Sequence, residues 1–185
     1  DQFDKSKTAD APFHLVDGST VNVPMMTRFG PVRAGFTSDY MVLDMPYGNA
    51  AYTMTVVVPR EGLSVNSVAE SLTQDAWAAL DKSLYEENRI LYFPRFKLSW
   101  ERQLKDDLAA MGMGIAFSGA ADFCNMSDEG LAISRVIQKT YVDVNEEGTE
   151  AAAVTAVGMV AVSAPGPIRV DRPFIAMNCA GLPET

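Results

Sequence analysis

The chain has 185 residues, 48% of them hydrophobic, and 15 Lys and Arg against 24 Asp and Glu give a formal net charge of −9 at pH 7. This length suits one domain with a sizeable core, and the acidic balance argues against a nucleic-acid partner. No apolar run approaches a membrane span of roughly 20 residues, and no signal peptide is recognised. Cys124 and Cys179 are too few for a disulfide framework; they can pair, but two free thiols are favoured.

The first third of the chain predicts β structure. Four segments have the composition of strands, and they are residues 3–8, 13–23, 40–45 and 52–58. The first two segments are expected as strands around a turn at Asp17-Gly18, and residues 46–49 give a hairpin-type connection between the other two. Val56-Val57-Val58 is a continuous apolar run, so this strand is expected to be covered on both faces.

Two short helices are expected next. Ser64 or Asn66 can cap the first helix, which ends near Leu72, and Thr73 can cap the second. Asp75 in the first turn favours the positive end of the helix dipole. The buried stripe of the second helix is expected to be Ala76, Trp77 and Leu80.

Residues 89–98 alternate well enough for one long strand or two consecutive ones, with Pro94 at the break. A third helix is expected to place three side chains on one face: Leu104, Leu108 and Met111. Gly112 then supplies a left-handed stop. Residues 131–144 predict one more strand.

The stretch that follows suits two different conformations. Charge stops after Glu150, and no ionisable residue returns until Arg169. Alternate residues within 149–157 are small and uncharged, so they can face an interior as a strand. Gly158 and residues 165–167 instead predict an exposed loop. An Ala-rich helix or a plain linker remains the alternative, because Glu-Ala-Ala-Ala has high helix propensity.

Four motifs in order resemble the serpin family of protease inhibitors: DGSTVNVPMM at 17–26, LYFPRF at 91–96, EEGTEAAA at 146–153 and DRPF at 171–174. The resemblance runs from about Phe3 to Phe174. It implies an α+β, multi-sheet serpin fold, with parts of sheets A, B and C and three short helices in a single partial domain over 1–185. The N-terminal half of a serpin is expected to be absent from this chain.

The resemblance also assigns roles. It implies a reactive-centre loop at about 146–168, with a hinge formed by Glu146, Glu147, Gly148, Thr149, Glu150, Ala151, Ala152 and Ala153. Counting from the hinge places the reactive bond between Val162 and Ser163, with Met159 as the alternative reactive residue. In serpins a basic residue after the proline matching Pro94 pairs with the acidic residue at the hinge base, which implies a structural ion pair of Arg95 and Glu146.

The resemblance implies a serine protease inhibitor, without catalysis of its own, that acts by suicide-substrate loop insertion. Val162 fits a small apolar pocket, so the expected partner is an elastase-like protease. The second expected partner is the complementary N-terminal half. The alternatives are a non-inhibitory serpin, such as a carrier or chaperone, and an inactive fragment that self-associates through an exposed strand. A secreted protein is expected, with a cytoplasmic one as the alternative.

Other residues favour no catalytic, metal or cofactor site. His14 is the single histidine and is interpreted as a core or edge residue, and the separated cysteines complete no zinc set. Gly112-Met113-Gly114 lacks the third glycine of a nucleotide fingerprint. Asn125-Met126-Ser127 matches the pattern for N-glycosylation. Residues 175–177 begin a further strand, after which 178–185 depart from the serpin pattern, and 182–185 resemble a sortase-tag stub.

Overall fold

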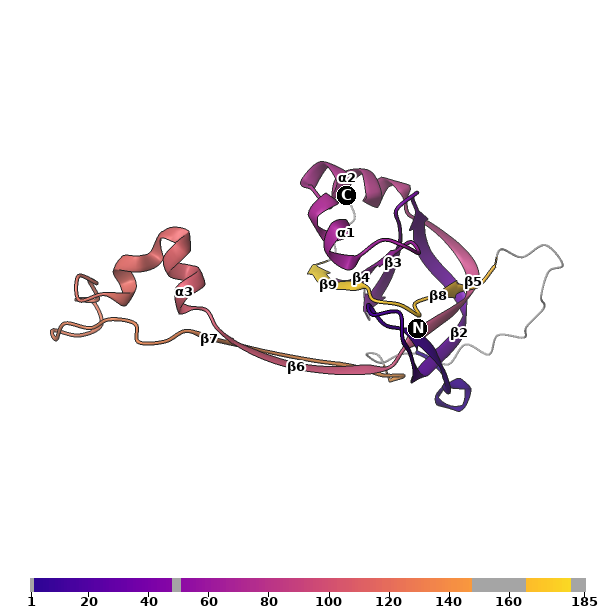
Figure 1. The fold of residues 1–185 in the computed structure, drawn as a ribbon, viewed down its shortest axis with the longest axis horizontal. Helices are drawn as coiled ribbons and strands as arrows, with labels where there is room; N and C mark the ends of the chain where they lie inside the picture. The colour runs from indigo at the N-terminus through magenta and orange to yellow at the C-terminus, as the bar shows by residue number, and fades with distance from the viewer. Residues whose placement is uncertain (1, 48–50, 148–165, 181–185) are drawn as a thin grey trace. The chain divides into compact units, whose positions relative to one another are not determined.

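The computed structural model describes residues 2–47, 51–147 and 166–180 (Figure 1). The chain divides into two compact units, which we call unit 1, residues 1–96 with 144–185, and unit 2, residues 97–143. The single domain expected from the sequence stays a prediction. Among the described helices, none is long and apolar enough to cross a membrane.

Unit 1 is built on a seven-stranded sheet. Its strands are β1 Ala9–His14, β2 Thr20–Phe36, β3 Tyr40–Tyr47, β4 Tyr52–Pro59, β5 Tyr85–Pro94, β8 Ile168–Arg169 and β9 Ile175–Ala180. They follow the order β8-β5-β2-β3-β4-β9, and β1 pairs with β2 off this path. All pairs are antiparallel except β5 with β8. The 17-residue β2 therefore joins β1, β3 and β5 in one sheet.

Both faces of this sheet are covered. Val42 and Val57 pack with Val68 and Leu80 of two helices, α1 Val65–Ser71 and α2 Gln74–Ser83, which lie on one side of the sheet in Figure 1. The opposite face forms a second cluster of buried residues that includes Met26, Leu43, Val56, Val58, Phe93, Ile168 and Val170. Alternate residues of β4 enter different clusters, which confirms the prediction from the continuous valine run.

The two helices of unit 1 begin where the sequence predicts. The Ser64 side chain accepts a hydrogen bond from the Ser67 amide at α1, and Thr73 accepts one from the Ala76 amide at α2. A Cβ atom on Gly35 would lie 3.0 Å from the Ser83 Oγ atom, so the end of α2 packs close against the bare backbone of β2.

The first segment differs from the prediction. Residues 3–8 do not form a strand, because Lys5–Lys7 make a short 3-10 turn, η1, and β1 begins at Ala9. The Asp4 carboxylate accepts hydrogen bonds from the Ser6 amide at 2.9 Å and the Ser6 hydroxyl at 2.7 Å. Such local bonds give the backbone an alternative to a strand ladder.

Unit 2 contains a two-stranded sheet of β6 Phe96–Gln103 and β7 Ile137–Val144, with α3 Lys105–Leu108, η2 Ala109–Met113 and η3 Gly114–Phe117 between them. Gly112 is left-handed, with φ 102°, at the predicted stop. Met111 does not continue the predicted helical face of Leu104 and Leu108, because α3 ends at Leu108 and Met111 lies in η2, where its side chain is 81% exposed. A π-type turn at η2 changes the helical phase there. β7 begins six residues later than predicted.

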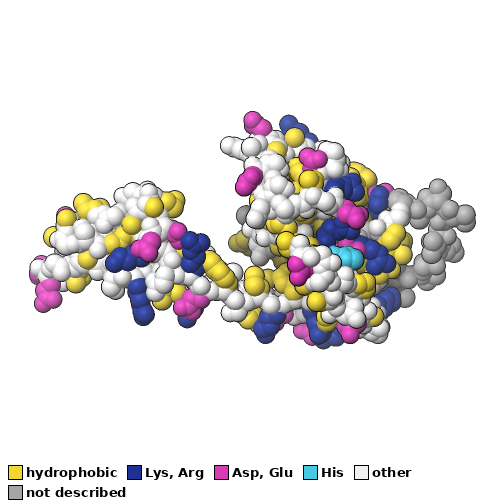
Figure 2. Space-filling view, viewed as in Figure 1, with side chains coloured by type: hydrophobic (Ala, Val, Ile, Leu, Met, Phe, Trp, Pro, Cys, Tyr) yellow, Lys and Arg dark blue, Asp and Glu magenta, His cyan; other side chains and the backbone are white. Residues whose placement is uncertain are grey.

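Residues 97–143 are all described, and none of them is buried. Large hydrophobic side chains remain exposed, and they are Leu98, Trp100, Met111, Met113, Ile115, Met126, Leu131 and Tyr141. Figure 2 shows hydrophobic side chains on the surface of this unit. Unit 2 therefore has regular strands and a helix but no core of its own.

Candidate functional site

The base of the predicted reactive loop lies at residues 145–147, directly after β7. Glu146 has a side chain that is only 4% exposed, and it is the one charged residue that is buried among the described residues. A buried carboxylate is costly unless it is hydrogen-bonded and paired. Its partners therefore define this site.

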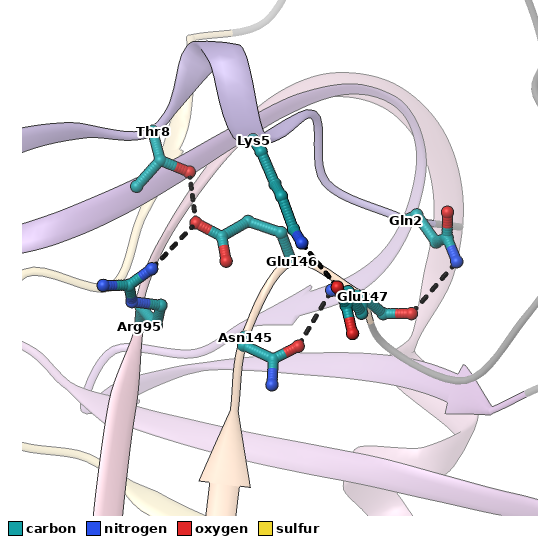
Figure 3. Close-up of polar contacts among 7 residues, drawn as sticks. All are labelled: Gln2, Lys5, Thr8, Arg95, Asn145, Glu146 and Glu147. Carbon is teal, nitrogen blue, oxygen red and sulfur yellow. Dashed lines mark hydrogen bonds and ion pairs between the residues drawn. The ribbon is translucent and has the colours of Figure 1, made fainter.

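Thr8 and Arg95 hold the side chain of Glu146 (Figure 3), and Phe3 holds its backbone. The Thr8 hydroxyl donates a hydrogen bond of 2.7 Å to the Glu146 Oε1 atom. The Nη1 atom of Arg95, at the end of β5, lies 3.6 Å from the same oxygen. The Phe3 amide donates to the Glu146 carbonyl at 3.2 Å. Both the side chain and the backbone of Glu146 are thus fixed to unit 1.

These contacts favour the ionised carboxylate. The hydrogen bond from Thr8 is the largest influence, and together with a backbone amide and Arg95 it holds the pKa of Glu146 below its usual value, against the opposing effect of burial. The side chain of Arg95 is 50% exposed, so solvent screens its charge. The short bond from Thr8 is therefore the main electrostatic anchor.

The neighbouring Glu147 is bound differently. Its side chain is 72% exposed and forms an ion pair with Lys5, and the hydrogen bond in this pair raises the pKa of Lys5. The Gln2 side chain donates to the Glu147 carbonyl at 3.0 Å, and the Asn145 side chain accepts from the Glu147 amide at 2.9 Å. The segment before β1 therefore contacts both acidic residues, one by a buried contact and one at the surface.

The far end of the predicted loop is also attached to unit 1. The Arg89 side chain donates to the Gly166 carbonyl at 3.2 Å. The Val170 amide donates to the Tyr92 carbonyl at 3.0 Å, and the Arg169 guanidinium lies 3.8 Å from the centre of the Tyr92 ring. The chain therefore leaves the described part of unit 1 after Glu147 and returns to it at Gly166.

The structure brings together Arg95 and Glu146, the two residues assigned to an ion pair; their anchoring role stays a prediction. The other loop residues assigned from the sequence lie outside the described residues: Gly148, Thr149, Glu150, Ala151, Ala152, Ala153, Met159, Val162 and Ser163. Sequence reasoning missed Thr8, Lys5 and Gln2. The one available signal was Asp4 two residues before Ser6, which is typical of a local turn.

The remaining candidates lie elsewhere. His14 is exposed at the end of β1, with its Nδ1 atom 3.3 Å from the Thr20 hydroxyl oxygen. Cys124 is a free, exposed thiol, and Asn125 follows it in an exposed turn. Within the described ranges, no group of three or more His, Cys, Asp or Glu residues is placed to hold a metal ion.

The described residues form a mixed α+β structure, and unit 1 holds the residues on both sides of 148–165. A model described as serpin, serine protease inhibitor, matches residues 1–179, and the chain belongs to the serpin family. It is 39% identical over 184 residues to Iris from Ixodes ricinus, covering 94% of this chain and 48% of that protein. It is 33% identical over 179 residues to a serine protease inhibitor from Cyanea capillata, with the same coverage.

Solved structures agree with this assignment. Mouse protein-Z dependent protease inhibitor matches with a TM-score of 0.81 and 30% identity, over 97% of this chain and 47% of that chain. Thyroxine-binding globulin in complex with thyroxine matches with a TM-score of 0.82 and 29% identity, over 97% and 48%. The expected multi-sheet α+β fold is confirmed, and the chain spans about half the length of the relatives it matches.

Proposed function

We propose that the protein to which this chain contributes is a serine protease inhibitor that acts as a suicide substrate. The observation that supports it best is the fixed base of the loop, where Glu146 is buried against Thr8 and Arg95. Small residues follow directly, with Glu150 as the last charge before Arg169. Two relatives, a serine protease inhibitor from Cyanea capillata and mouse protein-Z dependent protease inhibitor, support the same function.

In this proposal the target protease attacks the carbonyl carbon of Val162. The bond to Ser163 breaks, and the protease remains attached as an acyl-enzyme. The freed segment then inserts into a sheet as a new strand, which is the established behaviour of serpins as a family. Each new backbone hydrogen bond contributes a net of about 1 kcal/mol. The two ladders of bonds along an inserted strand therefore stabilise the cleaved protein by on the order of 10 kcal/mol.

The contacts at the base support a pivot directly after Glu146. Glu146 keeps its buried partners, whereas the ion pair of Glu147 with Lys5 is at the surface and costs little to break. Gly148 follows at once and lacks a Cβ atom, so its backbone turns without steric conflict. We therefore place the pivot between Glu146 and Thr149, with Thr149 as the first side chain to enter the sheet.

The chemistry of the loop favours a target with a small apolar pocket. Residues 151–168 contain no Lys or Arg, so a trypsin-like pocket has no basic side chain to bind. Val162 suits the shallow pocket of an elastase-like protease, and Met159 is the reactive residue if the register differs.

The rest of the parent protein has a structural role in this proposal. Unit 2 leaves Leu98, Trp100 and Tyr141 exposed by 44–60%, and exposed apolar groups of this kind mark a surface that binds other protein. The relatives extend to about twice the matched length. We propose that the complementary half of the parent covers unit 2 and completes the sheet that accepts the loop.

The test uses the full-length parent mixed with pancreatic elastase and analysed on a denaturing gel. A covalent complex that survives denaturation is expected. Thr149→Arg should give cleaved protein without complex, because a charge would have to enter the sheet. Ala152→Arg is the matched control. In an inserted strand its side chain would alternate with that of Thr149 and face solvent, so this variant should still form the complex.

Two outcomes separate the parts of the proposal. If wild type gives no complex with elastase but Val162→Arg gives one with trypsin, the mechanism stands and the target class is wrong. Clean cleavage without complex in both cases favours a non-inhibitory carrier. The fold allows that alternative, since thyroxine-binding globulin resembles the chain as closely as the inhibitor does.

A further inference from the structure

A compact turn lies in unit 2 between η3 and β7. The Asp122 carboxylate accepts a hydrogen bond of 3.1 Å from the Cys124 amide. The amides of Met126 and Ser127 both donate to the Phe123 carbonyl, at 2.8 and 3.2 Å. These bonds direct residues 124–126 outward, and all three are exposed.

The Asn125 side chain takes no part in building this turn. Asn in a turn commonly bonds to the backbone two residues on, but here Asp122 provides that bond. The Ser127 hydroxyl accepts from the Glu129 amide at 3.1 Å and so closes the other side. Within the part of the chain that the structure describes, no hydrogen bond or ion pair involves the side-chain amide of Asn125. This group is therefore accessible for covalent modification.

The sequence singles out the same residue. Of the seven asparagines in the chain, Asn125 alone has Ser or Thr two positions later, and the residue between them is Met126 rather than proline. This is the acceptor pattern for N-glycosylation, which requires an accessible loop in a protein of the secretory route. We propose that Asn125 carries an N-linked glycan.

The donor in this reaction is a lipid-linked oligosaccharide pyrophosphate. The Asn125 Nδ2 atom forms a bond to the anomeric carbon of the first sugar while the bond from that carbon to the pyrophosphate oxygen breaks. The lipid pyrophosphate leaves with the electron pair, and one amide proton passes to a base. No atom is oxidised or reduced, so no further reagent is needed.

A glycan at this position has a consequence for its neighbour. Cys124 is a free and exposed thiol, and in an oxidising compartment such a thiol exchanges into intermolecular disulfides. A hydrated oligosaccharide one residue away keeps a second protein molecule from approaching the sulfur. The glycan therefore lets an unpaired surface cysteine persist in a secreted protein.

The test expresses the complete coding sequence in cultured animal cells and recovers the secreted protein. Tryptic peptide 106–135 is treated with a peptide N-glycosidase in heavy-oxygen water, and Asn125 should convert to labelled Asp in most molecules. Asn125→Gln and Ser127→Ala should remove the glycan, and Ser127→Thr should keep it. Asn66→Gln, at an exposed position of α1, is the matched control and should change nothing.

Two results would overturn the proposal: an unmodified Asn125 in secreted protein, or unmodified protein that stays in the cytosol. Shielding of Cys124 is tested separately on a non-reducing gel. Secreted Asn125→Gln should show several-fold more disulfide-linked dimer than wild type, and adding Cys124→Ser should remove it. Equal dimer content in both proteins would overturn the shielding role.

Discussion

Units 1 and 2 both contain strands, helices and large hydrophobic side chains, but they differ in how far those side chains are buried. Unit 1 contains side chains that are fully buried, such as Phe93, Leu43 and Val57. Unit 2 has none, although residues 97–143 form two strands and a helix. Hydrophobic patterning thus predicts which face of an element is to be buried, but the covering element can lie on another part of the protein.

The largest expected effect on stability comes from removing a side chain in the core of unit 1. Phe93 is fully buried and packs its ring against Phe96 and Phe174 at 6.4 and 5.8 Å. Phe93→Ala should lower the free energy of unfolding by about 3–5 kcal/mol, both in the 185-residue chain and in the full-length parent. Urea unfolding measures the change in each.

The matched change in unit 2 is Leu98→Ala. Leu98 is 51% exposed, so this variant should cost less than about 0.5 kcal/mol in the 185-residue chain. In the full-length parent it should cost about 2 kcal/mol or more if the complementary half buries the side chain as proposed. Equal small costs in both proteins would contradict the proposed role of the complementary half.

Much of unit 1 could be predicted from local sequence. Ser64 and Thr73 accept the predicted capping bonds, and the run 56–58 is buried on both faces. Each of these signals acts over a few residues, so the chain carries it without reference to distant partners. A local signal of the same kind was also readable in unit 2, where the left-handed backbone of Gly112 lies at the predicted helix stop.

Long-range features could not be derived in this way. Thr8 and Glu146 are 138 positions apart, and nothing in either local pattern indicates the other. Residues 3–8 look like a strand by composition, yet the side chain of Asp4 stabilises a turn. Arg95 and Glu146 were paired only through family resemblance, because two charges in a sequence do not reveal their distance.

The loop base shows the same contrast between a buried and an exposed position in two adjacent residues. Glu146 is buried and Glu147 is exposed, although they are neighbours. Glu146→Ala should cost about 1–3 kcal/mol, since Thr8 loses its buried acceptor. Glu147→Ala should cost less than about 0.5 kcal/mol. Thermal unfolding of the full-length parent measures both, and a larger effect from Glu147 would refute the assignment of the anchor.

The pH dependence of stability tests the assignment of Glu146 as the anchor of the loop base. Because Thr8 holds the pKa of Glu146 below its usual value in the folded protein, the carboxylate stabilises the fold at pH values above its unfolded pKa. That stabilisation is lost as the pH falls through the depressed folded value. Thr8→Val should raise the folded pKa toward the unfolded value, so the variant should be less stable at neutral pH and lose less stability on acidification than wild type. NMR titration of Glu146 measures the shift, and an unchanged pKa in Thr8→Val would contradict it.

The smallest expected effect is at the surface of unit 2, where stability should not change at all. A hydrogen bond with Asp122 raises the pKa of the Cys124 thiol above its usual value, because the carboxylate favours the protonated sulfur. Asp122→Asn should lower that pKa and speed alkylation by iodoacetamide several-fold at a pH just below it, since the thiolate is the nucleophile. Bacterially produced protein carries no glycan, so the pH–rate profile reports this interaction alone. An unchanged rate in Asp122→Asn would contradict this prediction and would mean that solvent screens the pair completely.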